Sequence, residues 1–193
     1  MAVPTGAATG RREQILTVAA RLFARHGFHG VSIADLGAAV GVSGPALYRH
    51  FPGKEALLAE MLVGISEHLL AGGRERATVD GDARATLEAL VDFHLDFALT
   101  SPDLIVVQDR DLANLPPSRG AGFACCSVPT SRSGWTCCGD HPGLTPEAAR
   151  IAAHGAFGLL NSTPHSGARG STREVAALLR GMALTALTTL PAA

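Results

Sequence analysis

The residues best suited to contacting another molecule lie between positions 32 and 54. Small residues at 43–46 would let a helix approach a partner closely, and hydrogen-bonding or cationic side chains flank them. Small apolar groups can touch thymine methyls, and the polar groups can bind phosphates or base edges. We therefore expect a nucleic-acid contact here. The candidate residues are Ser32, Ser43, Gly44, Pro45, Ala46, Tyr48, Arg49, His50 and Lys54.

Helix signals place these candidates on a pair of short helices. Residues 11–26 carry an apolar stripe at helical spacing. Ser32 and Asp35 have the Ser-x-x-acid form of a capping box that starts a second helix, and Gly41 is positioned to end it. Ser43 can then cap a third helix. Two short helices joined by a tight glycine-containing turn are typical of a helix-turn-helix, whose second helix enters the DNA major groove.

The segment resembles the DNA-binding domain of the TetR family of bacterial regulators, over roughly residues 11–60. The resemblance rests on Ser32-Ile33-Ala34-Asp35-Leu36, Gly41-Val42-Ser43-Gly44-Pro45-Ala46-Leu47-Tyr48-Arg49-His50-Phe51 and Lys54-Glu55-Ala56-Leu57, with Gly27-Phe28 before them. It implies an all-α fold, in which a three-helix DNA-binding head precedes a helical body that binds a ligand and dimerises. One departure is Gly37, where the family usually has Ala.

We expect three regions along the chain. Residues 1–10 form a flexible tail, residues 11–55 form the helix-turn-helix domain with a linking helix over 54–70, and residues 71–193 form a ligand-binding and dimerisation domain. A polar break is expected over 72–81. Further helices are expected over 82–100, 101–112, 145–160 and 172–190. The last two are too hydrophobic for single-sided surface helices, and the resemblance implies a homodimer through them.

Charge separates along the chain although the net charge is only −1. Six Lys or Arg and two Asp or Glu occur up to Lys54, against ten and fifteen beyond it. A basic head on an acidic body favours a localised anion-binding face. With 47% hydrophobic and 17% charged residues, the composition excludes a disordered chain. No signal-peptide pattern and no apolar run of about 18 residues is evident, so we expect a cytoplasmic protein.

Five residues of the body are candidates for lining a pocket for a small apolar ligand, although each suits an apolar core better than a ligand contact. They are Phe93, His94, Phe97, Gln108 and Phe157. Asp109, Asp111 and His94 could be drawn as a hydrolytic set, but no nucleophile–base or metal motif supports it. We expect no catalytic residue, metal or cofactor. The sequence favours a DNA-binding repressor released from its operator by a ligand; a regulator without a ligand and a small helical enzyme or carrier are the alternatives.

Residues 116–140 fit none of the expected helices. They contain all four cysteines, at Cys125, Cys126, Cys137 and Cys138. Adjacent pairs lack the Cys-x-x-Cys spacing of a zinc knuckle, which disfavours a zinc site. A one-base shift of the reading frame converts Cys126 and Cys138 to Leu and allows helical periodicity. We therefore hypothesise a compensated frameshift, in the gene or in its recorded sequence, and sequencing the coding DNA tests it.

Overall fold

The computed structural model describes residues 7–77, 82–115, 145–165 and 171–189, and in these ranges it contains helices and no strand. The all-α class expected from the sequence is confirmed. The α-helices of these ranges are α1 (Ala7–His26), α2 (Ile33–Val40), α3 (Gly44–Leu47), α4 (Lys54–Ala77), α5 (Ala83–Thr100), α6 (Pro102–Asp111), α9 (Pro146–Leu160) and α10 (Thr172–Thr188). Two single-turn 3₁₀ helices, η1 (Leu112–Asn114) and η2 (Thr163–His165), follow α6 and α9.

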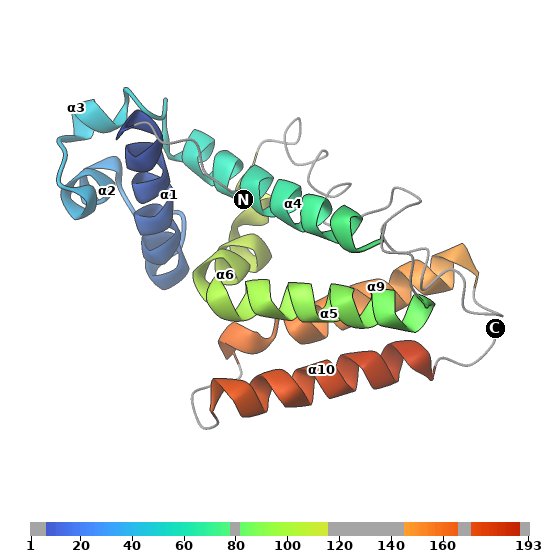
Figure 1. The fold of residues 1–193 in the computed structure, drawn as a ribbon. Coiled ribbons are helices and arrows are strands. Elements are labelled where there is room, and N and C mark those ends of the chain that lie inside the picture. The colour runs from blue at the N-terminus through green and yellow to red at the C-terminus, as the bar shows by residue number, and fades with distance from the viewer. Residues whose placement is uncertain (1–6, 78–81, 116–144, 166–170, 190–193) are drawn as a thin grey trace.

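Figure 1 shows α1, α2 and α3 grouped at one end of the molecule, and we call this group the head. Helix α4 leads from the head to the remaining helices, α5, α6, α9 and α10, which we call the body. Helix α10 packs on both α5 and α9, and α5 also packs on α4. The head and the body meet where α1 lies against α6.

Local signals set the limits of α2 as expected. The Ser32 hydroxyl accepts a hydrogen bond of 3.1 Å from the Asp35 N–H, and the Asp35 carboxylate accepts one of 2.9 Å from the Ser32 N–H. The Ser32 hydroxyl also donates to the Asp35 carboxylate at 2.6 Å, and this bond and the one from the Ser32 N–H lower the pKa of Asp35, because they stabilise its charged form. The helix ends at Gly41, whose φ of 71° lies in the left-handed region that favours glycine. The sequence prediction of both ends is confirmed.

Helix α4 does not end where the sequence predicts. It continues to Ala77, so the polar break expected over 72–81 is wrong for its first six residues. The reason is a close helix contact: a Cβ at Gly72 would lie 2.1 Å from Cζ of Phe93. Glycine here admits the Phe93 ring against α4 rather than ending the helix. The tail expected over 1–10 is also shorter, because α1 already begins at Ala7.

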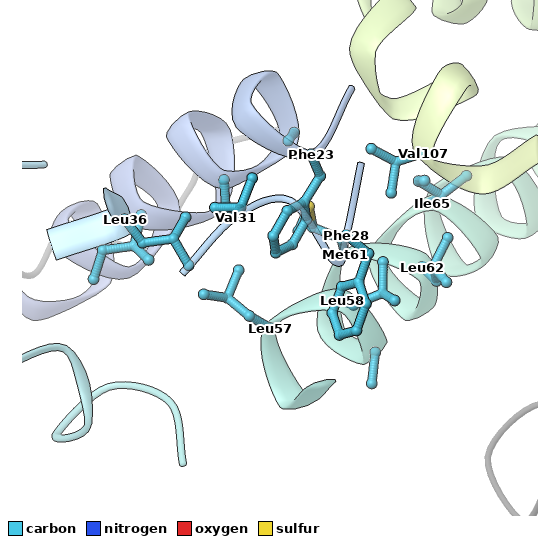
Figure 2. Close-up of a cluster of buried hydrophobic side chains, with 14 of the residues drawn as sticks. Phe23, Phe28, Val31, Leu36, Leu57, Leu58, Met61, Leu62, Ile65 and Val107 are labelled. Atoms are coloured by element: carbon cyan, nitrogen blue, oxygen red, sulfur yellow. The ribbon is translucent and has the colours of Figure 1, made fainter. Parts of the chain in front are cut away.

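The apolar core is continuous across the junction of head and body. Phe23 and Phe28 of the head pack with Leu58 and Ile65 of α4, and Val107 of α6 belongs to the same buried cluster (Figure 2). A second cluster joins α5, α9 and α10. Full burial of one such side chain contributes about 1.5–3 kcal/mol, so the shared core holds the head firmly on α6.

Helix α4 is also long and apolar enough to cross a membrane by length and composition, with a mean hydropathy of 1.3 over its best window. Half of that window is buried inside the protein. Such burial is typical of a core helix that joins two parts of a folded domain.

Candidate nucleic-acid interface and body cleft

The segment around α3 separates buried anchors from an outer surface. Leu47 and Phe51 are 0% and 1% exposed, which confirms that they face the core. Tyr48 is 55% exposed, so it is not a core aromatic. The other candidates of this segment divide by exposure: Ser43, Pro45 and Arg49 are exposed, and Gly44, Ala46 and His50 are half-buried. The arrangement presents small, hydrogen-bonding and cationic groups together on one short stretch of chain.

The two helices of the turn approach each other closely because of Gly37. A Cβ at this position would lie 2.8 Å from the carbonyl oxygen of Val42 and 3.3 Å from the amide nitrogen of Gly44. The Gly37 carbonyl also accepts a 2.9 Å hydrogen bond from the Val42 N–H. The glycine that departs from the family pattern therefore has a structural role in seating α3 on α2.

Lys54 is engaged within the protein. Its ammonium donates to the carbonyl oxygens of Phe28 at 2.8 Å and Val31 at 3.0 Å, and lies 4.5 Å from the centroid of the Phe28 ring. These contacts fix the loop before α2 and use two of the three ammonium donors, so the phosphate contact expected of Lys54 from the sequence stays a prediction. Lys54 is thus a positioning residue for the helix-turn-helix.

Arg12 has a similar role and was missed from the sequence. Its guanidinium donates to the carbonyl oxygen of His50 at 2.5 Å, bonds the carboxylate of Glu60 and lies 4.2 Å from the Phe51 ring centroid. The one signal in the sequence was a cationic residue near the start of the first helix. Its partners could not be predicted, because they lie 38 and 48 residues further along the chain.

Ser32 and Arg49 differ in whether their side chains are already bonded within the described residues. Ser32 is exposed, but its hydroxyl and N–H both bond Asp35, so it acts as a helix cap in this structure. Arg49 makes no ion pair within the described ranges, and its exposed guanidinium is available to an outside anion. In this segment the exposed side chains without a bond within the described residues are therefore those of Tyr48 and Arg49, whereas the Ser32 hydroxyl is bonded to Asp35.

Where the head meets the body, a cleft of about 730 Å³ lies among α1, α4, α5 and the first turn of α6. Phe93 and Phe97 line it, whereas His94, Gln108 and Phe157 do not. His94 is only 5% exposed, bonds Asn161 at 2.8 Å and lies 4.5 Å from the Phe157 ring centroid. Of the five predicted pocket residues, two thus line this cleft, and His94 joins them to Phe157 because its ring also lies 6.5 Å from that of Phe97.

Three groups that do not line the cleft have unusual surroundings. Burial lowers the pKa of His94, and the hydrogen bond with Asn161 opposes this only in part. The side-chain oxygen of Gln108 is buried without a hydrogen-bond partner among the described residues. Burial also raises the pKa of the neighbouring Asp109.

A metal site finds no support in the described part of the chain, where no group of three or more His, Cys, Asp or Glu side chains comes together. The four cysteines lie outside the described residues. So do the zinc and frameshift hypotheses for residues 116–140.

The fold and the site together define a helical protein with an N-terminal helix-turn-helix head. Residues 15–61 match the family described as bacterial regulatory proteins, tetR family. The chain is 33% identical over 111 residues to the HTH-type transcriptional repressor KstR2 of Rhodococcus jostii, covering 58% of this chain and 54% of that protein. It is 33% identical over 87 residues to the HTH-type transcriptional activator FasR of Mycolicibacterium smegmatis, covering 45% and 40%. The chain thus spans about half the length of the curated relatives it matches.

Solved structures agree over nearly the whole chain. A TetR-family transcriptional regulator from Bordetella parapertussis superposes with a TM-score of 0.79 at 25% identity, over 94% of this chain and 98% of that one. AibR, in complex with isovaleryl coenzyme A and operator DNA, superposes with a TM-score of 0.73 at 19% identity, over 89% and 97%. Residues 15–61 thus match the TetR-family DNA-binding domain, and the fold of the chain is that of solved TetR-family regulators.

Proposed function

We propose that this protein is a DNA-binding transcriptional regulator, acting as a repressor in the cytoplasm, that leaves its operator when a small apolar ligand binds. The observation that carries the proposal is the exposed Tyr48 and Arg49 beside the buried anchors Leu47 and Phe51. Buried anchors hold the segment rigidly, and the exposed side chains can then reach phosphates or base edges of the major groove.

A homodimer through α9 and α10 completes the DNA-binding unit. Of the five large hydrophobic side chains that are exposed in the described ranges, three lie on these helices: Ile151 at 63%, Leu178 at 64% and Met182 at 48%. The other face of α10 is already used inside the chain, where Leu179 and Ala183 are buried against α9 and α5. Apolar groups on a second face of a helix favour burial against another subunit. Two subunits would present two recognition segments to two half-sites.

Effector binding would act on the spacing of the two heads. A ligand that binds one arrangement better shifts the population towards it, and an arrangement that mismatches successive major grooves lowers the affinity for the operator. We propose Phe93 and Phe97 as ligand contacts, with His94, Phe157 and Gln108 behind them. The complex of AibR with isovaleryl coenzyme A and operator DNA supports a small-molecule effector for a protein of this fold.

Selection from random-sequence DNA duplexes tests the function, because it needs no assumed operator sequence. We expect enrichment of an inverted repeat whose half-site centres lie about one helical turn of 10–10.5 bp, or a multiple of it, apart. Fluorescence anisotropy on the selected duplex should show weaker binding by Tyr48→Ala. Arg84→Ala, which removes an exposed cation of α5, should bind like wild type. Failure to enrich any sequence, or equal binding by Tyr48→Ala, would contradict the proposal.

A further inference from the structure

The cleft described above lies between the head and the body, not inside the body alone. One wall is formed by α1 of the head, through Leu16, Thr17, Ala20 and Arg21. Helix α4 forms the floor, α5 forms the opposite wall, and residues 101–104 at the start of α6 close one end. We infer that this cleft binds a small amphipathic monoanion, and that the bound molecule bridges the head and the body.

The apolar part of such a ligand would lie on a row of rings. The ring of His68, on α4, lies 5.3 Å from that of Phe93 and 5.5 Å from that of Phe97, measured between centroids. All three rings line the cleft, as do the apolar side chains of Met61 and Ile65 on its floor. Clefts lined mainly by aromatic and aliphatic groups with a few polar ones are typical of small-molecule sites.

Arg76 is the residue that would bind the anionic group of the ligand. It lies at the end of the cleft nearest the C-terminus of α4. Its guanidinium lies 4.0 Å from the Phe93 ring centroid, and one of its nitrogens donates to the Gly72 carbonyl at 2.8 Å. These two contacts hold the group in place. No carboxylate of the described residues pairs with it, so within these residues its remaining N–H groups are available to a ligand carboxylate. A guanidinium that is already ordered loses little entropy when it binds a carboxylate.

The other charged groups of the cleft do not favour a cationic ligand. Glu60 is neutralised by its ion pair with Arg12. Arg21 and Asp103, from the two walls that meet at the α6 end, contribute opposite charges. Asp96 is exposed, so water screens its charge. Arg76 is therefore the charge that a ligand lying on the Phe93 ring would meet.

A ligand in this cleft would contact α1 directly. In the position of the head that the structure shows, a ligand can contact Leu16 and Ala20 on one side and Phe97 on the other. Binding would therefore favour that position, because a ligand shifts an equilibrium by its difference in affinity for the two states. This regulatory step rests on the proposed DNA-binding function, whereas the binding of the ligand does not.

Gly64 allows the cleft to be filled without disturbing the fold. It lies on the floor of the cleft, and a Cβ built there meets nothing within 4 Å. Gly64→Phe should place a ring in the cleft, and Gly64→Ala is the matched control that leaves it open. Thermal melting followed by circular dichroism checks that both variants are folded.

The probe is 1-anilinonaphthalene-8-sulfonate, an aromatic monoanion, with decanoate and 1-decanol as competitors. We expect saturable binding of the probe, displaced by decanoate, in wild type and Gly64→Ala, and at least about tenfold weaker binding in Gly64→Phe. Arg76→Gln should weaken competition by decanoate about tenfold, the value of a charged hydrogen bond, and leave that by 1-decanol unchanged. Equal binding by the two Gly64 variants, or an Arg76→Gln variant that treats both competitors as wild type does, overturns the inference.

The selected DNA duplex separates this inference from the proposed function. Decanoate should change the DNA affinity of wild type and Gly64→Ala but not that of Gly64→Phe. If the protein binds decanoate in the cleft but selects no DNA sequence, the ligand site stands and the proposed function is wrong. A protein whose DNA affinity responds to decanoate equally in all three forms places the effector elsewhere and overturns the inference.

Discussion

The guanidinium of Arg110, on α6, lies 3.2 Å from the carbonyl oxygen of Ala24, in the last turn of α1 and 86 residues earlier in the chain. A second nitrogen of the same side chain donates to the carbonyl of Phe23 and to the carboxylate of Asp111, which is 3% exposed. A cation at the carboxyl end of a helix is favourable because the last carbonyls are otherwise unpaired. The body thus holds the end of the first head helix by polar bonds as well as by the shared core.

Removing this contact should destabilise the whole chain. Arg110→Ala leaves two carbonyls and the buried Asp111 without their cation, and we expect the free energy of unfolding to fall by about 1–3 kcal/mol, the range for hydrogen bonds to charged groups. Urea unfolding measures the change. Arg150→Ala is the control, because its pair with Glu147 is exposed and such pairs contribute about 0.2–1 kcal/mol. Equal losses in the two variants would show that the α1–α6 bonds add nothing.

Lys54 and Tyr48 should affect DNA binding for different reasons. Lys54→Met removes both bonds to the loop before α2, and we expect it to lower the free energy of unfolding by about 1–3 kcal/mol and DNA affinity with it. Tyr48→Ala alters an exposed side chain, so DNA affinity should fall by about 1–3 kcal/mol with stability unchanged. Anisotropy on the selected duplex and urea unfolding give the two quantities. A stability loss in Tyr48→Ala alone would reverse these roles.

Gly37 and Gly64 should respond oppositely to alanine. Both lie in helices, where alanine is favoured over glycine by about 1 kcal/mol. Gly37→Ala would place a Cβ 2.8 Å from the Val42 carbonyl, so we expect a net loss of about 1–3 kcal/mol. Gly64→Ala meets open space and should stabilise the chain. Calorimetric melting of the two variants tests this, and a gain in Gly37→Ala would mean that α3 moves away from α2 at little cost.

Charges on the exposed face of α10 should disrupt the proposed dimer. We expect the double variant Leu178→Glu, Met182→Glu to be a monomer in analytical ultracentrifugation, because carboxylates cannot be buried there without partners. Its DNA affinity should fall at least about tenfold, since the two half-sites are then bound separately. Val63→Glu, an exposed apolar residue of α4, is the control and should remain a dimer. A dimer that survives the double change would place the interface elsewhere.

His94 should make stability depend on pH. Its folded-state pKa is lowered by burial from the usual value of 6.5. As pH falls through about 6.5 towards the folded pKa, the unfolded state takes up a proton that the folded state does not, so stability falls. Urea unfolding between pH 7.5 and 5.5 should show this loss, and His94→Gln should reduce it. The exposed His154→Gln variant should keep the wild-type profile; an unchanged profile in His94→Gln would assign the loss to other groups.

Much of the head follows from local sequence. The Ser32–Asp35 capping box, the left-handed Gly41 and the apolar spacing that buries Leu47 and Phe51 each depend on residues within four positions of one another. Such interactions form in the same way whatever the rest of the chain does, so the ends of α2 and the outward face of Tyr48 were predictable.

Other features depend on residues that meet only after folding. Gly72 indicates a helix break in the sequence. In the structure α4 continues through it, and the Phe93 ring packs against it. Lys54 was expected from the sequence to bind phosphate, and only the fold shows that its ammonium also binds two carbonyls more than 20 residues away. By itself the sequence determined the helical class, the helix-turn-helix and the resemblance to the TetR family. The tertiary structure alone decided which of these side chains are free, which are already bonded, and that the cleft lies between α1 and α5, because those outcomes depend on packing between distant segments.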